Sequence, residues 1–555
     1  MEQELLSIPS LSIGLFSTAQ GNYASPQMLG DIHRAAQLAD TATSPERLRI
    51  LSIPAGPLGR ARLATLTRQR PPHELVLVIE RASAANAHEL RWSAVAGTGT
   101  GTGTGGRKST LTSQTTQQRG IVAAVDVAPT LLNHLRLPVP AAMHGKPIHL
   151  DGALDGPALR SLKARLEVVY PRRLPALACL LAAWALLIAA TSLAAATTRP
   201  ANRGGRRAAP VRWTIRVGAL AMLWAPVAML LPAALEPSPA LEYALIVLTC
   251  FSLAALGDRL ISWPRAVIAP AAAAIVAIVL DSLLGTQLLI RSLLGPNPAY
   301  GSRFYGIGNE LKSGLAVLVF AAVAAALYPA IRSRRAAATM GCAGALLALI
   351  EGAARIGAGV GGVILVCAGT AVASVMLLPG PLRRRRVLLV LAAPLVGLLL
   401  LAVIDLVSAH GAGHFTGSVL DARSASDFQE EIVRRYEAAW KELRNGLMPV
   451  ATALALLLAT LGVRYRERLL EPVYCDPAWQ AALAGGLTAG FLGALCEDSG
   501  PVLLVVAVFA LACMIAYLYT GPRKCNAEPA PASASAAAPE HRLAPSAPLS
   551  GRSAL

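Results

Sequence analysis

The segment RRRRVLLVLAAPLVGLLLLAVID, residues 383–405, decides the fold of this chain. Four arginines precede a long apolar run, and Asp405 stands at its far end. At 1.5 Å rise per residue, about twenty helical residues cross the roughly 30 Å hydrocarbon core of a bilayer. The same pattern of a basic cluster beside an apolar run recurs through the second two-thirds of the sequence. It predicts a polytopic membrane protein.

The apolar runs after residue 173 number eleven, and several are close to the short limit of a membrane span. They cover residues 174–197, 215–234, 240–256, 266–284, 307–328, 336–352, 357–379, 387–407, 447–463, 479–495 and 499–519. We therefore expect an all-α transmembrane bundle of about eleven helices over residues 171–520.

Every second loop between these runs is rich in arginine, which predicts the orientation of the chain. The clusters are Arg199, Arg203, Arg206, Arg207 and Arg212; Arg259 and Arg265; Arg332, Arg334 and Arg335; Arg383 to Arg386; Arg464, Arg466 and Arg468; and Arg523 with Lys524. Basic loops stay in the cytoplasm. We therefore expect a plasma (inner) membrane protein with residues 1–173 outside the cytoplasm, and with the Ala/Pro/Ser-rich tail 521–555 inside and disordered.

Composition places the chain in the membrane class and argues against a nucleic-acid partner. It is 54% hydrophobic and 15% charged, with a mean hydropathy of +0.52. The net charge of +18 comes largely from arginines at the ends of apolar runs, where orientation and lipid headgroups account for them. The excess of arginine over lysine and the abundance of alanine are typical of a GC-rich bacterial genome. The bilayer is the partner that this composition predicts.

Residues 1–170 contain no cysteine, so we expect this domain to fold without disulfides. No Cys/His spacing in the chain is typical of a metal site, and we expect neither metal nor cofactor. An exported domain needs a signal or anchor, but residues 1–10 have no basic region followed by an apolar core. We expect either a true start further upstream or export driven by the first span.

The same region has the pattern of an α/β domain. Strands are predicted at 11–16, 73–80, 92–96 and 120–126, helices at 26–38, 127–135 and 155–169, and a flexible Gly-Thr loop at 97–106. The strand at 73–80 is a continuous apolar run, which favours burial. Asp126 and Asp155 stand where each would cap the helix that follows, and Pro171 should end the last helix before the first span.

The segments DVAPT (126–130), LP (137–138) and MHG (143–145) resemble the C-terminal part of alkaline phosphatase and sulfatase superfamily domains. The resemblance implies a phosphatase-like scaffold. Those enzymes bind two metals, usually through an Asp-His-Gly signature after a strand, and use a Ser or Thr nucleophile. Here Arg81-Ala82-Ser83 follows the equivalent strand, and nothing nearby would activate Ser17 or Thr18. The resemblance therefore implies a scaffold without catalysis.

The membrane region also resembles uncharacterised bacterial membrane proteins that carry such a domain. The similarity lies in FYGIGNE (304–310), GAGVGG (357–362) and GHFTG (413–417). No activity follows from this resemblance, so function has to be argued from the residues themselves.

Ionisable residues gather at the predicted outer ends of the spans, beside many glycines. An ionisable group at mid-bilayer costs about 2.5–3.5 kcal/mol, so such positions indicate a polar cavity facing outward. The predicted catalytic residues are Glu310, Asp405 and His414, and the predicted substrate-binding residues are Arg303, Asn309, Glu351, Arg355 and Asp498. Glu310 would serve as base or cation ligand, and Arg303 or Arg355 would hold an anion.

An amphipathic helix is predicted at 424–445, lying in the outer interface, covering that cavity, or packed on the N-terminal domain. Three functions remain open. The protein could process a lipid-linked or anionic envelope precursor, it could be a transporter or flippase, or it could be a non-catalytic scaffold that binds envelope proteins.

Overall fold

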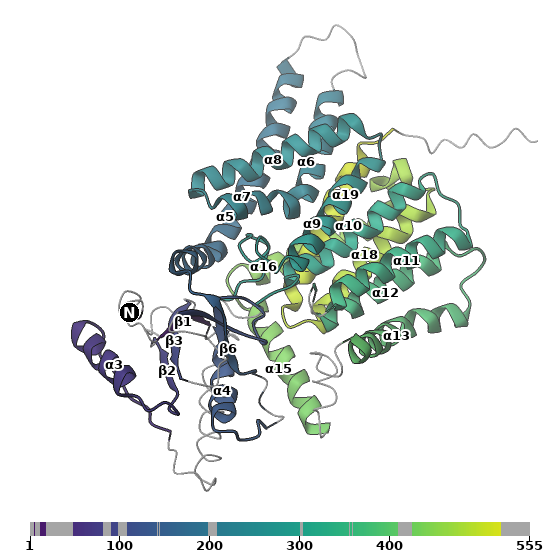
Figure 1. Ribbon diagram of the computed structural model, residues 1–555. Helices are drawn as coiled ribbons and strands as arrows, with labels where there is room; N and C mark the ends of the chain where they lie inside the picture. Colours follow the sequence, from purple (N-terminus) through teal and green to yellow (C-terminus); the bar gives the residue numbers. More distant parts are fainter. Residues whose placement is uncertain are drawn as a thin grey trace, which may run out of the picture.

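A small β-sheet near the N-terminus is followed by helices up to residue 519 (Figure 1). The computed structural model describes residues 5, 11–17, 48–80, 90–97, 108–140, 143, 145–197, 208–299, 304–353, 356–357, 359–408 and 425–522. The sheet and its helices lie at one end of the helical bundle, and helix α5 (Gly156–Thr197) connects the two parts (Figure 1).

Six strands form one mixed sheet in the order β2–β3–β1–β4–β6, with β5 paired to β1. They are β1 (Ser12–Ser17), β2 (Val76–Ile79), β3 (Arg91–Ala96), β4 (Ser109–Ser113), β5 (Ile121–Ala123) and β6 (Ile148–Ala153). The central strand β1 is parallel to β4 and β5 and antiparallel to β3. Leu63 of helix α3 (Pro57–Gln69) and Leu159 of α5 pack in one apolar cluster with the sheet, and Val127 of α4 (Val127–His134) packs in another.

The predicted strands at 11–16 and 92–96 and the helix at 127–135 are confirmed as β1, β3 and α4. The predicted burial of the 73–80 strand is wrong. β2 is shorter, only half-buried and at the edge of the sheet, because β3 is its only neighbour in the strand order. The 120–126 strand is also shorter, since the chain turns into a 3₁₀ helix (η1, Ala124–Asp126) after β5. The predicted helix at 26–38 and residues 98–106 of the Gly-Thr loop lie outside the described residues.

Asp126 does not cap α4 with its side chain, contrary to the sequence-based expectation. Its carboxylate points back into the sheet and accepts hydrogen bonds from the amides of Ala123 (2.9 Å) and Lys146 (3.0 Å) and from the Thr115 hydroxyl. Burial raises the pKa of this carboxyl, and the hydrogen bonds partly oppose the shift. Asp126 therefore ties the turn after β5 to the segments that carry Thr115 and Lys146.

The helix that follows the sheet is α5 (Gly156–Thr197), and it is continuous over 42 residues. Asp155 caps it as expected, with its side chain accepting from the amide of Ala158 at 2.9 Å. The predicted break at Pro171 is wrong, because α5 continues through both Pro171 and Pro175. A proline removes one backbone donor from a helix, and here Arg172 and Arg173 bond to neighbouring segments beside it.

The remaining helices form the bundle. They are α6 (Ala208–Ala228), α7 (Leu230–Leu235), α8 (Pro239–Leu260), η2 (Arg265–Val267), α9 (Ile268–Leu283), α10 (Asn309–Leu327), α11 (Arg334–Gly352), α12 (Val360–Leu377), α13 (Arg384–Ser408), α15 (Ala425–Leu443), α16 (Met448–Arg464), α17 (Arg466–Leu469), η3 (Glu471–Val473), α18 (Pro477–Cys496) and α19 (Gly500–Tyr519).

Each of the eleven predicted runs contains a helix, but nine helices of the described residues are by themselves long and apolar enough to cross a membrane. α11 and α16 are outside this set, and a tenth span is added if α16 is counted together with the end of α15. α16 has 17 residues and so extends about 26 Å. The structure thus fits a multi-pass helical membrane protein without confirming eleven spans.

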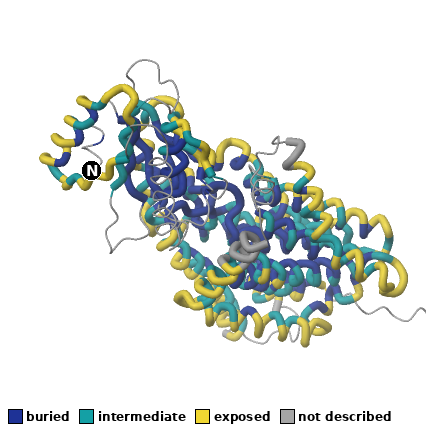
Figure 2. The backbone as a smooth tube through the Cα atoms, turned by 90° about the horizontal axis from the view of Figure 1, so that it is seen from below, coloured by how far each residue is buried: buried dark blue, intermediate teal, exposed yellow. Residues whose placement is uncertain are grey.

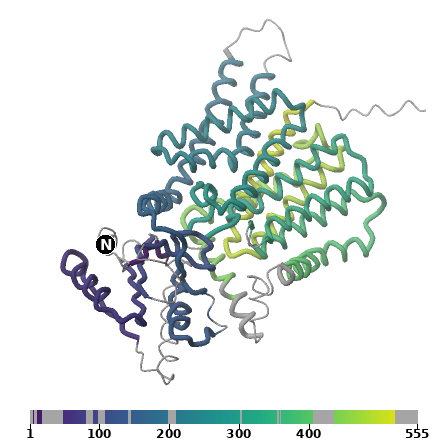
Figure 3. Tube along the Cα trace, in the orientation of Figure 1, coloured from purple at the N-terminus to yellow at the C-terminus, as the bar shows by residue number. Residues whose placement is uncertain are grey.

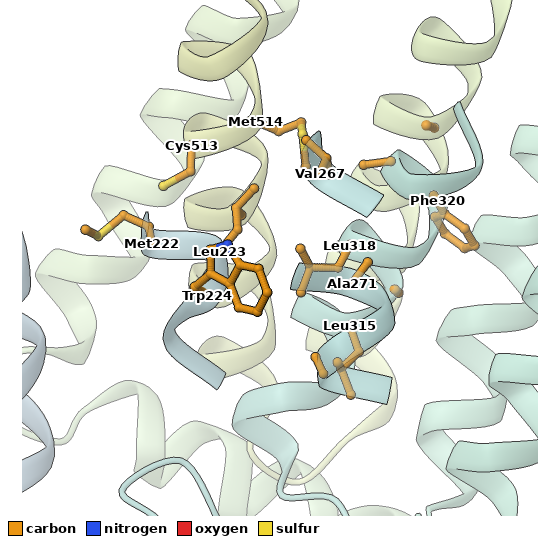
Figure 4. Close-up of a cluster of buried hydrophobic side chains, with 14 of the residues drawn as sticks. Met222, Leu223, Trp224, Val267, Ala271, Leu315, Leu318, Phe320, Cys513 and Met514 are labelled. Carbon is orange, nitrogen blue, oxygen red and sulfur yellow. The ribbon is translucent and has the colours of Figure 1, made fainter. Parts of the chain in front are cut away.

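The core of the bundle is built where α6, α9, α10 and α19 meet (Figure 4). Trp224, Ala271, Leu315, Leu318 and Met514 point toward one another from these helices (Figure 4). Figure 2 places the buried residues along the middle of the sheet region and of the bundle, with exposed residues at the periphery. Helices far apart in sequence are therefore neighbours, since α10 lies against both α18 and α19 (Figure 3).

Candidate functional site

The first turn of α10 makes several polar contacts at one end of the bundle. It follows residues 304–308, which form no regular helix or strand and in which Gly306 has a φ of +80°. A Cβ at Gly306 would lie 2.8 Å from the carbonyl oxygen of Ile356, so glycine is needed both for the backbone angle and for the space. This close contact fixes where α10 begins. Its first side chains then reach α5, α18 and the loop between α18 and α19.

Lys312 of α10 is fully buried and forms an ion pair with Glu497, the residue that ends α18. The Glu497 side chain is itself only 6% exposed. Burying a charged pair costs several kcal/mol per ion unless geometry and further partners compensate. An ion pair at this position in an apolar bundle is therefore more typical of function than of simple stability.

Glu351 brings a second carboxylate to the same place. It is the penultimate residue of α11, and 0% of its surface is exposed. Its Oε2 atom is 2.5 Å from the point where a Cβ at Gly362 would stand, and the Cδ atom of Lys312 is 3.4 Å from that same point. Lys312, Glu351 and Glu497 thus gather from three helices. We call these three residues the charge cluster.

The glycines at the start of α12 leave room for the charge cluster. A Cβ at Gly359 would overlap the Lys312 ammonium, and one at Gly361 would lie 2.5 Å from the Glu497 carboxyl carbon. With Gly362 beside Glu351, each of the three charged side chains approaches at least one glycine. The positive end of the α12 dipole also favours carboxylates here. Gly359, Gly361 and Gly362 therefore allow close approach between helices.

Asn309 connects the start of α10 to the α18–α19 turn through hydrogen bonds. Its side-chain amide donates to Asp498 Oδ1 (2.7 Å) and to the Ser499 hydroxyl (3.0 Å). One turn further along, the Ser313 hydroxyl donates to the carbonyl of Leu503 (2.7 Å). Two predicted site residues, Asn309 and Asp498, are thus in direct contact beside the charge cluster.

Glu310 points in another direction, toward the N-terminal part of the chain. It forms an ion pair with Arg173 of α5. The Arg173 guanidinium also donates to the carbonyls of Leu293 (2.6 Å) and Gly295 (3.2 Å) in the segment before α10. Glu310 therefore fastens α10 to α5.

Further ion pairs join α5 to α8 and connect the segments beside this junction. Arg165 and Arg172 both bind the carboxylate of Glu242 in α8, at 2.6 and 2.8 Å, and Arg165 and Glu242 are nearly inaccessible to solvent. Arg291 forms an ion pair with Glu236. Apolar residues of the same inter-helix segment, including Phe304 and Tyr305, pack in the cluster that fills one side of the sheet. Sheet, α5 and α10 are thus packed as one unit.

The predicted site residues fall into four groups. Asn309, Glu351 and Asp498 lie at or beside the charge cluster, and Glu310 belongs to the junction. Asp405 lies within α13. Arg303, Arg355 and His414 lie outside the described residues. A shared cavity containing all eight residues stays a prediction.

Lys312 and Glu497 are not among the site residues predicted from the sequence. A signal was available, because lysine is rare in this chain and Lys312 falls inside a predicted span.

With all three members ionised, the charge cluster carries one net negative charge, and a single bound proton or monovalent cation would neutralise it. The arrangement is therefore chemically suited to bind and release a proton or cation.

Among the described residues, no group of three or more His, Cys, Asp or Glu side chains is arranged to hold a metal ion. A surface hollow lined by Glu467, Arg468, Leu469, Glu471 and Tyr519 lies at the other end of α19. Since α19 has 20 residues, this hollow is about 30 Å along the helix from the α18–α19 turn. It is thus remote from the charge cluster.

Comparisons with protein families, with curated proteins and with solved structures found no match for this chain. The class that the fold defines is a multi-pass helical membrane protein with a small N-terminal sheet region.

Proposed function

We propose that this chain is a bacterial cell-envelope transporter or flippase for a lipid-linked or anionic envelope precursor, and that the charge cluster binds the coupling proton. The observation that carries the proposal is the burial of Lys312, Glu351 and Glu497 together inside a bundle of apolar helices. Ionisable groups in such surroundings typically belong to proton relays and ion pathways. The arginine-rich loops support a plasma-membrane location with the cluster toward the outer face.

Glu310 has a positioning role in this proposal. Its ion pair with Arg173 directs the carboxylate at α5 and away from the charge cluster, whereas a general base must lie within hydrogen-bond reach of the proton that it removes. Transport therefore fits the contacts of this cluster better than catalysis with Glu310 as base.

Complementation of a deletion strain tests the transport role. We expect the deletion strain to accumulate a lipid-linked envelope intermediate. Expression of Glu351→Gln at normal membrane levels should not reduce that accumulation. Glu467→Gln, at an exposed position on α17, is the matched control and should restore the normal profile. If Glu351→Gln also restores the normal profile, the proposed transport role is contradicted. The result would then favour a non-catalytic scaffold.

Infrared difference spectroscopy tests proton binding without knowledge of the substrate. A pH step applied to the full-length protein in lipid should produce a band from a buried protonated carboxyl group. We expect Glu351→Gln or Glu497→Gln to remove that band, and Glu467→Gln to leave it. A spectrum that neither cluster variant changes would contradict proton binding at the charge cluster.

A further inference from the structure

Helix α15 carries an exposed apolar stripe. Val433, Tyr436 and Trp440 are 46%, 57% and 55% exposed. Their spacing of three and four residues places them on one face of the helix. The exposed charged residues Glu437 and Lys441 follow at the next positions along the chain. Large apolar side chains aligned in this way indicate a surface that binds an apolar partner.

The helix that follows shows what kind of partner this is. α15 and α16 meet at a 91° bend across a short break. The apolar exposure continues from α15 through Leu447 into Val450 and Leu454 of α16. A helix perpendicular to a membrane-crossing helix runs along the membrane surface. The continuous apolar surface then faces lipid on both arms of the bend.

The position of α15 along the bundle follows from the alternation of the helices. α16 leads away from α15 to the end where α18 begins, and α18 returns to the end where Glu497 lies. α15 therefore lies at the same end as the charge cluster, and it contacts α19 there (Figure 1).

The aromatic residues have the chemistry of the lipid headgroup region. The Arg444 guanidinium lies over the Trp440 ring at 4.6 Å. Trp and Tyr are enriched at membrane interfaces, because the ring enters the apolar layer while its polar atom stays near water. A cation stacked on such a ring remains within reach of lipid phosphate.

We propose that α15 is an interfacial helix that lies in the headgroup layer of the bilayer, on the side of the charge cluster, with Val433, Tyr436 and Trp440 inserted between lipids. This inference does not depend on the transport role, because it rests on the exposure of α15 and its angle to α16. The lipid bilayer itself is the partner.

Site-directed spin labelling of the full-length protein in proteoliposomes tests the insertion. Single cysteines replace Tyr436, Glu437 and Leu454 in a chain free of its native cysteines. We expect the label at 436 to be accessible to oxygen at about 5–10 Å below the headgroup boundary. The label at 437 should be accessible to a water-soluble nickel chelate, and the one at 454 should lie deeper in lipid. Water accessibility at both 436 and 437 would overturn the proposal, as would a label at 436 shielded from both reagents by the N-terminal domain or a second copy.

A second measurement keeps the native cysteines. Fluorescence of the full-length protein is compared with that of Trp440→Phe in vesicles whose lipids carry bromine near the carbonyl end of the acyl chains. The difference between the two proteins gives the emission of Trp440. We expect bromine to quench this emission strongly. If bromine leaves that part unquenched, Trp440 is not in the headgroup layer and the proposal fails.

Discussion

At the scale of the residue, variants of the Lys312–Glu497 ion pair distinguish a role in stability from a role in transport. Lys312→Met leaves two buried carboxylates without the lysine charge and should cost about 3–5 kcal/mol of unfolding free energy. The double variant Lys312→Met/Glu497→Met should recover most of that loss, because apolar groups of similar size replace both charges.

Thermal unfolding of the full-length protein in one detergent measures the stability of these variants, and the complementation assay measures their function. We expect the double variant to be stable but inactive. A double variant that is both stable and active would mean that the pair is dispensable.

The pKa of Asp126 predicts a pH dependence in the sheet. Because burial raises the pKa of this carboxyl above the unfolded value of about 3.9, the native state binds the proton more tightly than the unfolded state. Its contribution to stability is therefore present at low pH and is lost as the pH rises from about 4 through the raised pKa.

Amide hydrogen exchange over residues 109–126, corrected for intrinsic rates, measures this effect. The opening free energy should fall with rising pH in the native chain, and Asp126→Asn should remove that fall. The variant should also lower stability by about 1–3 kcal/mol, because its amide cannot accept all the hydrogen bonds that the carboxylate accepts. Identical pH profiles in the two proteins would contradict the raised pKa.

At the scale of the element, the glycines of α12 predict a steric effect. Gly361→Ala places a Cβ 2.5 Å from the Glu497 carboxyl carbon, so α12 and α18 must separate and the ion pair must shift. We expect a loss of about 1–3 kcal/mol in thermal unfolding. Gly462→Ala in α16 is the matched control, since the nearest atom there is 3.9 Å from the added carbon. Unchanged or increased stability of Gly361→Ala would contradict the close packing.

The contact between α5 and α8 predicts a second element-scale effect. Glu242→Gln leaves Arg165 and Arg172 without their shared carboxylate in a buried position, which should cost about 3–5 kcal/mol. Glu167→Gln breaks only the partly exposed pair with Lys163 and should cost less than about 1 kcal/mol. Denaturant unfolding of the full-length protein measures the free energy of unfolding of both variants. Equal losses would contradict a stabilising contact between α5 and α8.

The sequence predicted local features better than long-range ones. Apolar runs and the Asp155 cap depend on neighbouring residues, so α5, α10 and α19 could be located in advance. Beside Pro171, where α5 continues, Arg172 bonds to a residue more than 60 positions away, and no local pattern contains such a contact. For the same reason the sequence grouped Glu310 with Glu351, while the fold directs their side chains to different partners.

At the scale of the whole molecule, the membrane topology decides on which side the sheet region and the charge cluster lie. Cysteines introduced singly at Gly103 and Ala536 in a cysteine-free chain should react differently with a membrane-impermeant reagent in intact cells. The arginine distribution predicts labelling at 103 and none at 536. The reverse pattern would place the sheet region and the charge cluster on the cytoplasmic side.

The continuity of α5 has a consequence for imaging this protein. A bundle of apolar helices gives little contrast inside a detergent micelle, so particle images are hard to align. Here a single helix of 42 residues, about 63 Å long, runs from the sheet into the bundle and is fastened at its middle by ion pairs. The sheet therefore acts as a built-in fiducial marker (Figure 1), whose orientation in each particle reports that of the helices.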